Sequence, residues 1–166
     1  NTRENKEKNN ILIGNSANPS NNHIDIFNTL ILFKIGDRKI FCPLSYGTNL
    51  NEYVDKVIKE GEIIFGNIFM PLKEFVHIDK YNEIVNSCNI VIMNHTRQQA
   101  VGNIVSSIWH GSKVYLNENN PVYQYFISIG VKIFSIQEDL VYTNQNAFIS
   151  LDEKTILNNR AILIKN

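Results

Sequence analysis

The sequence predicts an α/β fold built on a doubly wound, mainly parallel sheet of six strands, Rossmann-like in its order. The chain has 166 residues, of which 43% are apolar, enough for one compact domain with a buried core. From residue 10 onward, short apolar runs alternate with amphipathic segments, the pattern of repeated βαβ units. The run at residues 90–93 is apolar throughout, which is typical of a strand covered by helices on both faces.

The first half of the pattern contains three strands and the helices between them. Strands are expected at residues 11–14 and 40–44. The helix between them, at residues 23–35, should bury Ile24, Phe27, Leu30 and Ile31. The next helix has the clearest spacing, with Gly61 as its stop and an apolar face formed by Leu50, Tyr53, Val54, Val57 and Ile58. A third strand is expected at residues 63–65.

The second half continues the alternation. A loop at residues 71–75 leads to a helix whose apolar face carries Ile78, Tyr81, Ile84 and Val85. The strand at residues 90–93 is followed by a helix that stops at Gly111 and buries Val101, Ile104, Val105, Ile108 and Trp109. The remaining strands are expected at residues 114–116 and 131–134. The remaining helices are expected at residues 121–129 and 152–164, and Pro121 suits the first turn of the former.

Charge and cysteine content exclude several classes of protein. Sixteen basic residues balance sixteen acidic ones, so the chain lacks the positive surplus used to bind nucleic acid, and no nucleic-acid partner is expected. No apolar run approaches the roughly 20 residues of a membrane-spanning helix, and no export signal is visible, which favours a cytoplasmic location. Cys42 and Cys88 should lie on strands either side of the first strand, too far apart for a disulfide.

Residues 1–10 are polar throughout and lack apolar periodicity. We expect them to be a linker that follows a preceding domain absent from this chain, with a tail or tag remnant as the alternative. Residues 11–166 would then form a single domain.

Open parallel sheets bind ligands beyond the carboxyl ends of their strands, at the switch between the first and fourth strands. The first loop at this switch, residues 14–23, concentrates small hydrogen-bonding side chains just before a helix. Either Ser20 or Asn21 is expected to be the N-cap of that helix. Capping the helix needs only one of these side chains. The other hydroxyls and the backbone N–H groups of this loop therefore predict a binding site for an anion, with phosphate as the expected ligand.

The second loop, residues 94–103, carries Arg97 at the start of the next helix. A guanidinium fork beside a helix N-terminus suits phosphate oxygens. Gly102 and Ser106 lie four residues apart on that helix, where small side chains permit either packing against the sheet or close approach of a diphosphate. Arg97 beside the glycine favours the diphosphate.

Missing motifs exclude several other kinds of site. The first strand is not followed by GxGxxG or GxxxxGKS/T, which disfavours a dinucleotide oxidoreductase and excludes a P-loop NTPase. No acidic residue ends the first strand, which disfavours a phospho-accepting receiver domain. No His, Cys or carboxylate ligands cluster, so neither a metal nor another cofactor is expected. The histidines are dispersed and support no catalytic triad: His23, His77, His95 and His110.

Three segments resemble the motifs of a known family. Residues 14–23, GNSANPSNNH, look like its GNSxxxSNxH motif, and residues 97–102, RQQAVG, look like its RQQxxG segment. Residues 117–121, NENNP, are similar to its NxxNP turn. The family is the bacterial 4-acetamido-4,6-dideoxygalactose (Fuc4NAc) transferases of enterobacterial common antigen synthesis, often labelled 4-alpha-L-fucosyltransferases. The likeness runs from about residue 11 to residue 140, in the same order and spacing.

The resemblance implies the C-terminal, nucleotide-sugar-binding half of a GT-B glycosyltransferase, whose N-terminal acceptor domain lies outside this chain. Members of the family move a sugar from a dTDP-linked donor to a polyprenyl-diphosphate-linked glycan, without a metal, at the cytoplasmic face of the inner membrane. By that resemblance the donor site comprises Gly14, Asn15, Ser16, Ser20, Asn21, His23, Arg97, Gln98, Gln99, Gly102, Asn103, Glu118 and Asn119.

The resemblance also implies a role for most of these residues. Arg97 and the amides near Gly102 and Asn103 would hold the diphosphate. Residues 75–77 would contact the base, although Phe75 is equally suited to the core. The other roles are the donor-side wall (Ser16, Ser20 and Asn21), the sugar contacts (Gln98 and Gln99) and the contact to the nucleoside sugar hydroxyl (Glu118 or Asn119).

A second interpretation stays open: a GT-B nucleotide-sugar-binding domain of a sugar-nucleotide epimerase, or a binding module without catalysis. An epimerase would carry more acidic and basic residues in its sugar pocket than this sequence offers. No residue is identified as the catalytic base, and His23 and His95 are the only candidates in the two loops. Because the acceptor site and the base are expected on the facing domain, this chain alone should not transfer sugar.

Overall fold

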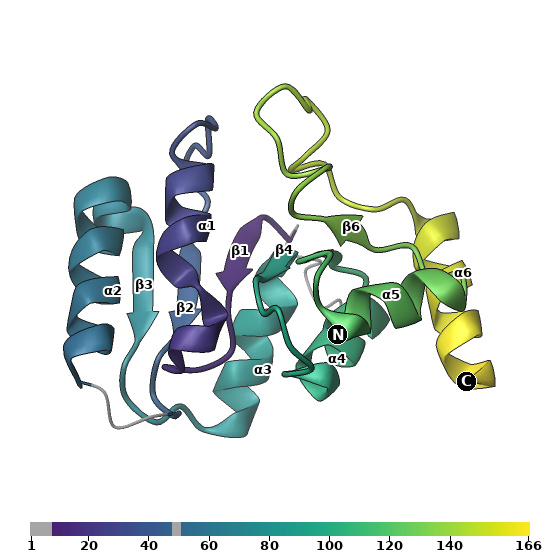
Figure 1. The fold of residues 1–166 in the computed structure, drawn as a ribbon, viewed down its shortest axis with the longest axis horizontal. Coiled ribbons are helices and arrows are strands. Elements are labelled where there is room, and N and C mark those ends of the chain that lie inside the picture. Colours follow the sequence, from purple (N-terminus) through teal and green to yellow (C-terminus); the bar gives the residue numbers. More distant parts are fainter. Residues whose placement is uncertain (1–7, 48–50) are drawn as a thin grey trace, which may run out of the picture.

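The sheet is the centre of the molecule, and its six strands are all parallel in the order β3-β2-β1-β4-β5-β6 (Figure 1). The computed structural model describes residues 8–47 and 51–166. β1 and β4 are central neighbours, so the strand order reverses between them, which confirms the predicted doubly wound fold. The strands are β1 (Asn10–Ile13), β2 (Ile40–Pro43), β3 (Phe69–Leu72), β4 (Cys88–Met93), β5 (Lys113–Leu116) and β6 (Phe134–Ser135).

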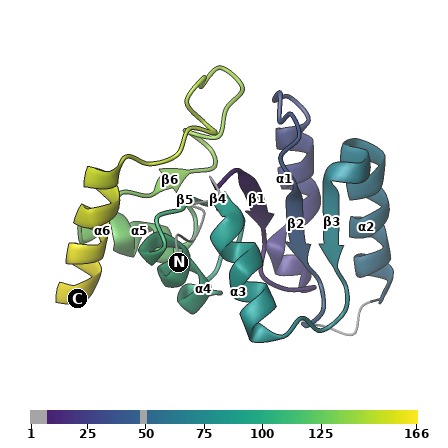
Figure 2. The same cartoon turned by 180° about the vertical axis from the view of Figure 1, so that it is seen from behind.

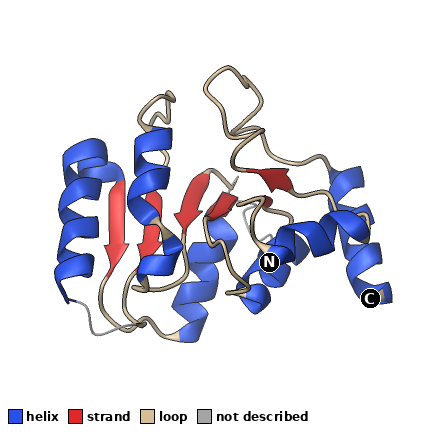
Figure 3. Ribbon diagram, viewed as in Figure 1, coloured by secondary structure: helices blue, strands red, loops and turns tan. Residues whose placement is uncertain are grey.

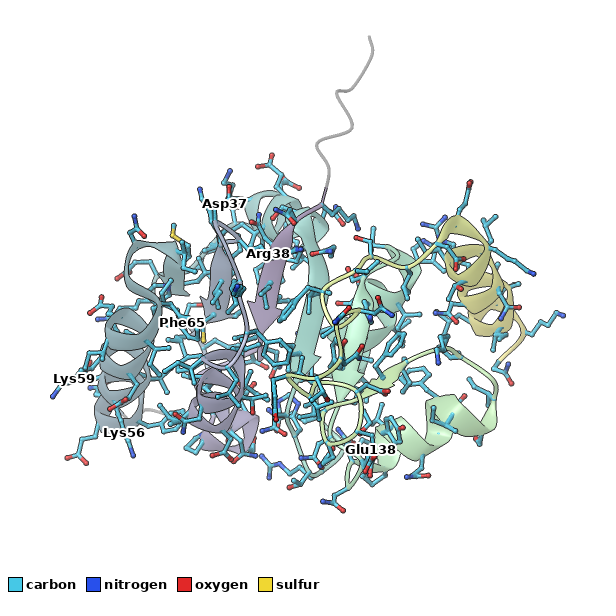
Figure 4. All side chains as sticks on the ribbon, turned by 90° about the horizontal axis from the view of Figure 1, so that it is seen from above. Asp37, Arg38, Lys56, Lys59, Phe65 and Glu138 are labelled. Atoms are coloured by element: carbon cyan, nitrogen blue, oxygen red, sulfur yellow. The ribbon has the colours of Figure 1, made fainter. Side chains whose placement is uncertain are left out.

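Helices cover both faces of the sheet (Figures 2 and 3). One apolar cluster joins the sheet to α1, α2 and residues 136–148, and the other joins it to α3, α4, α5 and α6. Lys56 and Lys59 project outward from α2, as its predicted charged face requires (Figure 4). The helices are α1 (His23–Leu30), α2 (Asn51–Phe65), α3 (Ile78–Ser87), α4 (Val101–Trp109), α5 (Pro121–Ser128) and α6 (Glu153–Lys165).

The strand pleat explains how one sheet supports two cores. Ile11 and Ile13 of β1 enter the cluster under α1, whereas Leu12 enters the cluster under α4. In β4, Ile90 and Val91 divide between the two clusters in the same way. Every residue of β4 is buried, as its continuous apolar sequence predicts for a strand covered on both faces.

The chain after β6 replaces a helix on one face of the sheet. Residues 136–151, here called the return segment, pass back across β5 and β4. The Tyr115 hydroxyl donates to the Ala147 carbonyl at 2.7 Å, and the Lys113 ammonium donates to the Asn146 carbonyl at 2.7 Å. Asn89 donates to the Ser150 hydroxyl at 2.9 Å. These hydrogen bonds attach the irregular return segment to β4 and β5, in the part of the sheet that α1 and α2 do not cover.

The third strand was expected too early. Residues 63–65 continue α2, and the strand is β3, after a 3-10 turn at Gly66–Ile68. Gly61 lies inside α2 and does not stop it; a Cβ there would lie 2.4 Å from the ring of Phe69. The glycine lets β3 pack against the helix. Leu50, expected on the apolar face of this helix, lies outside the described residues.

Other expectations about burial or length were also wrong. α1 ends at Leu30 rather than at residue 35, and Ile31 is 59% exposed while Ile26 is buried. In α4 the two ends of the predicted inward face, Val101 and Trp109, are 36% and 41% exposed. The last strand is shorter than predicted, because only residues 134–135 pair with β5 at the edge of the sheet.

Both cysteines are buried free thiols, on strands that flank β1. Burial raises the pKa of Cys88 to about 12, so this thiol is protonated at neutral pH. The domain begins slightly before residue 11, since Asn10 is already in β1 and the Asn9 amide donates to the Ser87 carbonyl at 3.1 Å. At the same edge Arg38 donates to the Asn9 carbonyl at 3.1 Å (Figure 4).

Candidate functional site

The loops that follow β1, β4 and β5 meet at the carboxyl edge of the sheet, the lower edge in Figure 1. They are residues 14–22, 94–100 and 117–120. Apart from residues 75–77, which precede α3, the sequence-predicted site residues lie in these loops or in the first turns of α1 and α4. The topology therefore brings together the two loops that the sequence analysis singled out.

Gly14 is the pivot of the first loop. Its φ of +70° lies in the left-handed region, which favours glycine. A Cβ at this position would lie 2.6 Å from His23 Nε2 and 2.7 Å from Asn21 Oδ1. Both the backbone turn and the close approach of two buried side chains therefore require glycine here.

Asn21 holds the first loop together from inside. Its side chain is 1% exposed, and its Oδ1 accepts from the Asn15 amide and contacts His95 Nε2, both at 2.9 Å. Its Nδ2 donates to the Ser16 hydroxyl at 3.1 Å and to the Asn18 carbonyl at 2.8 Å. These donations fix the amide orientation, so His95 must donate from Nε2. The bond joins the loop after β1 to the loop after β4.

The two buried histidines are neutral and enclosed. His23 contacts the Tyr53 hydroxyl through Nδ1 at 2.8 Å, and both imidazoles are 0% exposed. Burial lowers the pKa of His23 to about 4, with a smaller contribution from nearby His95. Burial likewise lowers the pKa of His95 to about 4, with a smaller contribution from Arg97. Neither ring reaches the surface of this structure to act as a base.

The helix caps differ from the prediction. Neither Ser20 nor Asn21 caps α1, because a 3-10 turn at Pro19–Asn21 comes first and is capped by the Asn18 side chain. Asn22, with φ of +48°, then precedes α1 without a side-chain cap. Asn22 instead donates from its Nδ2 to the Asn94 carbonyl at 3.0 Å, a second link between the two loops.

The N-terminus of α4 is open to an anion. Ala100, with φ of +57°, precedes the helix and provides no side-chain cap, and no acidic residue lies in the first turn. The other helices with described N-caps are different: α1 carries Asp25 in its first turn, and α3, α5 and α6 have side-chain caps. The first amides of α4 thus remain free to bind a negative group.

Arg97 and Gly102 complete this open helix end. Arg97 is exposed, and its Nε donates to Gln99 Oε1 at 3.3 Å. The Ser20 hydroxyl donates to the same Gln99 oxygen at 2.6 Å, so the amide links Arg97 to the first loop. A Cβ on Gly102 would meet no atom within 4 Å. Packing against the sheet therefore does not explain this glycine.

A chain of amide side chains continues the site across β5 and β6. Asn117 donates to Asn94 Oδ1 at 2.9 Å, and Gln137 donates to Asn117 Oδ1 at 2.9 Å. Glu118 is half-buried and accepts from the Ser135 hydroxyl at 2.6 Å. Its carboxylate is thus held in place rather than merely solvated.

Two hollows flank the end of α4. A hollow of about 110 Å³ lies between α3 and α4, where Asn103 and Ser106 meet Ile78 and Tyr81. A larger hollow of about 360 Å³ lies between α4 and α5 and is lined by Gln98, Val101, Pro121, Val122 and Tyr125. Phe75 is 86% exposed at this edge, so its alternative place in the core is wrong.

The structure separates the predicted site residues into two groups. Four of them are buried inside the first loop and the start of α1 and do not form the surface of the site: Gly14, Ser16, Asn21 and His23. This corrects the expectation that Ser16 and Asn21 line the cleft with their side chains. Nine are exposed or half-buried at the edge: Asn15, Ser20, Arg97, Gln98, Gln99, Gly102, Asn103, Glu118 and Asn119.

Tyr53, Asn94 and Gln137 also belong to this network, although the sequence did not predict them. Asn94 and Gln137 each follow directly or closely after a strand, a position that marks the carboxyl edge in a parallel sheet. Tyr53 gave no such signal, because it lies on a helix that is distant in sequence. Among the described residues, no group of three metal-ligating side chains comes together. None of the described helices is long and apolar enough to cross a membrane.

Solved glycosyltransferase structures share this fold. The chain matches a structure described as trehalose-6-phosphate from E. coli bound with UDP-2-fluoro glucose with a TM-score of 0.67 and 11% identity, over 96% of this chain and 40% of that chain. It matches WaaG, a glycosyltransferase involved in lipopolysaccharide biosynthesis, with a TM-score of 0.66 and 13% identity, over 97% and 44%. It matches Anabaena Alr3699/HepE in complex with UDP and glucose with a TM-score of 0.59 and 11% identity, over 95% and 48%.

These likenesses show that the fold is that of a GT-B glycosyltransferase domain. The chain spans less than half the length of each of those solved chains. A sequence profile described as 4-alpha-L-fucosyltransferase, glycosyl transferase group 56, matches residues 1–160. The chain therefore belongs to the 4-alpha-L-fucosyltransferase family of glycosyltransferases.

Proposed function

We propose that this chain is the donor-binding domain of a glycosyltransferase and binds a nucleoside diphosphate sugar at the carboxyl edge of its sheet. The observation that carries the proposal is the open N-terminus of α4, with Arg97 exposed beside it. A diphosphate is the ligand that this combination suits, because helix amides and a guanidinium both bind phosphate oxygens. Family membership supports the same function.

The diphosphate would lie over the first turn of α4. The amides of Val101, Gly102 and Asn103 have no partner within the helix, and Gly102 leaves room for close approach. Arg97, positioned by Gln99, would neutralise the charge that develops on the departing diphosphate. In this mechanism the chain's own amides and guanidinium stabilise the leaving group.

The rest of the donor would extend to either side of α4. The hollow between α3 and α4 offers Asn103 and Ser106 as polar groups and lies next to residues 75–77, so we assign it to the nucleoside. Glu118 and Asn119, predicted to contact the nucleoside sugar hydroxyls, directly precede α5 on the other side of α4 and do not line this hollow, and Glu118 already accepts from Ser135. Gln98 would face the transferred sugar.

We propose a dTDP-linked deoxyamino hexose such as Fuc4NAc as the donor and a lipid-linked glycan of bacterial surface polysaccharide synthesis as the acceptor. The support is the three-motif resemblance in residues 14–23, 97–102 and 117–121. The acceptor would bind a facing domain, at the cytoplasmic face of the inner membrane. Transfer is favoured over epimerisation, because an epimerase needs a base that reaches the sugar, and His23 and His95 are both enclosed.

Titration of the ¹⁵N-labelled chain with dTDP tests the proposal, with UDP and thymidine in parallel. The expected result is weak binding of dTDP, with the largest amide shifts at residues 97–103. Thymidine should perturb residues around the hollow between α3 and α4 without shifting the amides of residues 101–103. Absence of any shift with either nucleotide at millimolar concentration would overturn the proposal.

A further inference from the structure

Four residues with amide side chains are joined by hydrogen bonds along the carboxyl edge of the sheet. They are Asn22, Asn94, Asn117 and Gln137, which follow β1, β4, β5 and β6 respectively, and we call them the amide chain. Asn22 donates to the Asn94 carbonyl at 3.0 Å, and Asn117 donates to Asn94 Oδ1 at 2.9 Å. Gln137 donates to Asn117 Oδ1 at 2.9 Å. Because the four strands are neighbours in the sheet, the amide chain links four adjacent loops in their spatial order.

Two backbone amides fix the direction of the hydrogen bonds in the amide chain. The Asn119 N–H donates to Asn117 Oδ1 at 3.0 Å, and the Glu118 N–H donates to Gln137 Oε1 at 3.1 Å. Both oxygens are therefore acceptors, so Asn117 can meet Asn94 Oδ1 only through its Nδ2, which donates. The Asn94 side chain is 6% exposed, which shields this hydrogen bond from competing water.

The loop between β4 and α4, residues 94–100, is held from two sides. Three hydrogen bonds, through Asn94, His95 and Gln99, tie it to the first loop. Among the described residues, the Asn117–Asn94 bond is the one side-chain hydrogen bond that reaches residues 94–100 from the β5 side. Arg97 and the first amides of α4 follow directly along the chain. Their position on the β5 side therefore depends on this single hydrogen bond.

We propose that Asn94 and Asn117 are positioning residues for the donor. They fix Arg97 and the first turn of α4 from the β5 side, without touching the donor, so that the diphosphate meets a site that is already formed. The inference rests on the proposed donor function and adds to it, because it assigns part of the affinity to a hydrogen bond outside the ligand contacts. A guanidinium and helix amides that are held in place lose less conformational entropy when the ligand binds.

Uncharged amides suit this place beside a diphosphate. Apart from the neutral His95, residues 14–22, 94–100 and 117–120 contain only two ionisable side chains, Arg97 and Glu118. A carboxylate in the amide chain would repel the ligand, and an ammonium would attract the phosphates away from Arg97. An amide provides both a donor and an acceptor without a charge. The amide chain can therefore cross four loops and leave the field at α4 to Arg97 and the helix.

Asn94→Leu tests the proposal, because leucine has the same branched shape but accepts no hydrogen bond from Asn117. We expect dTDP to bind roughly tenfold more weakly, the lower end of the range for residues that orient metal ligands. Thymidine binding should stay within about twofold, since no residue of the amide chain lines the hollow between α3 and α4. Both affinities are measured by titration of the ¹⁵N-labelled chain, in which resolved amide signals report the folded protein.

Asn89→Leu is the matched control at the other end of β4. Asn89 is 4% exposed, donates to the Ser150 hydroxyl at 2.9 Å and accepts from Arg38 at 3.3 Å. The same substitution thus removes buried amide hydrogen bonds at either end of one strand. Both variants should unfold at lower urea concentration than the unmodified chain, but only Asn94→Leu should weaken dTDP binding.

Gln137→Met decides the question if Asn94→Leu does not fold. Gln137 is exposed, so this change removes the last link of the amide chain without opening the core. Asn117 then loses one of its partners, and dTDP should bind about threefold more weakly, the value of one hydrogen bond at the surface. Gln145→Met, on an exposed glutamine of the return segment outside the amide chain, should keep the original affinity.

The outcomes separate this inference from the proposed function. If dTDP does not bind the unmodified chain, the donor function fails and this inference with it. If dTDP binds but Asn94→Leu and Asn89→Leu change its affinity equally, the amide chain only stabilises the fold, and the donor function stands alone. Equal losses for thymidine and dTDP in Asn94→Leu would also overturn the inference. Where Asn94→Leu does not fold, equal dTDP affinities of Gln137→Met and Gln145→Met would overturn it.

Discussion

Asn21 illustrates why a polar motif in a ligand loop need not be a set of ligand contacts. Its amide uses both donors and its oxygen twice, entirely within the protein. An isolated buried amide would destabilise the fold, whereas a fully paired one makes the loop rigid. The side chains of the first loop therefore position the backbone and leave ligand contact to the residues around α4.

Gly14→Ala should destabilise the chain by about 2–4 kcal/mol, because it combines left-handed strain with a clash against His23 and Asn21. Gly36→Ala is the matched control, since Gly36 has a φ of +72° but no atom within 4 Å of an added Cβ. The control should lose only about 1–2 kcal/mol. Urea unfolding measures both, and equal losses would show that the close packing at Gly14 adds nothing.

Arg97→Ala should weaken dTDP binding by roughly 1–3 kcal/mol, the range of a hydrogen bond to a charged group, and leave thymidine binding nearly unchanged. Lys56→Ala removes the same charge from the outward face of α2 and should alter neither affinity (Figure 4). Calorimetry with both ligands provides the comparison. Equal losses for thymidine and dTDP would mean that Arg97 supports the fold and not the phosphates.

The two buried histidines make the fold sensitive to acid. Burial lowers the pKa of each from 6.5 to about 4 in the folded chain, whereas unfolding restores the ordinary value. Protonation therefore favours the unfolded state. The contribution of each histidine is complete above about pH 6.5 and is lost as the pH falls toward 4, on the order of 3 kcal/mol for each.

Urea unfolding between pH 7.5 and pH 4.5 measures this loss. His95→Gln provides the control, because the glutamine amide can still donate to Asn21 but does not titrate. Its stability should fall less steeply with acid than that of the unmodified chain. An identical pH dependence in the two proteins would contradict the assignment to His95.

At the scale of single elements, periodicity located the strands that are buried in the middle of the sheet. The run at residues 90–93 identified β4, and the short runs at residues 11–14 and 40–44 identified β1 and β2 to within one residue at each end. Strand order followed from the alternation of strands and helices. These features are encoded locally, because burial on both faces leaves a continuous apolar sequence.

The errors occurred where a distant contact overrides a local signal. Gly61 has the sequence signature of a helix stop, but Phe69 packs against it and α2 continues to Phe65. Ser20 and Asn21 have the signature of N-caps, but His95 and Gln99, more than 70 positions away, take up their side chains. The same holds for the candidate site: its loops were predictable from topology, but the direction of each side chain was not.

Gly102→Ala distinguishes a packing role from a ligand role for the first turn of α4. An added Cβ meets no atom within 4 Å, so stability should stay the same or rise by up to about 1 kcal/mol from helix propensity. Binding of dTDP should weaken on the order of tenfold, because the methyl group would stand in the path of the diphosphate. Gly61→Ala, which meets Phe69, should instead lower stability by about 1–3 kcal/mol. A loss of stability in Gly102→Ala would support the packing role.

At the scale of the whole molecule, one side of the proposed donor edge faces no other part of the chain that the structure describes. The hollows that flank α4 are shallow and open, and the solved glycosyltransferases that share the fold are more than twice as long as the part this chain covers. A facing domain would close the edge, exclude water and add the acceptor. Such closure strengthens each contact between Arg97 and the diphosphate.

The 166-residue chain should therefore bind donor but transfer no sugar. Transfer requires donor and acceptor to be held in contact. Holding two reactants together in this way can raise the reaction rate as much as an effective concentration of about 10⁵ M or more. The only histidines in the two ligand loops, His23 and His95, are enclosed and neutral, so the base is expected on the facing domain. Assays of this chain and of a protein that includes the facing domain, with a dTDP-linked deoxyamino sugar and a lipid-linked acceptor, test the division. Comparable turnover by the chain alone would refute it and return the role of base to a residue of this domain.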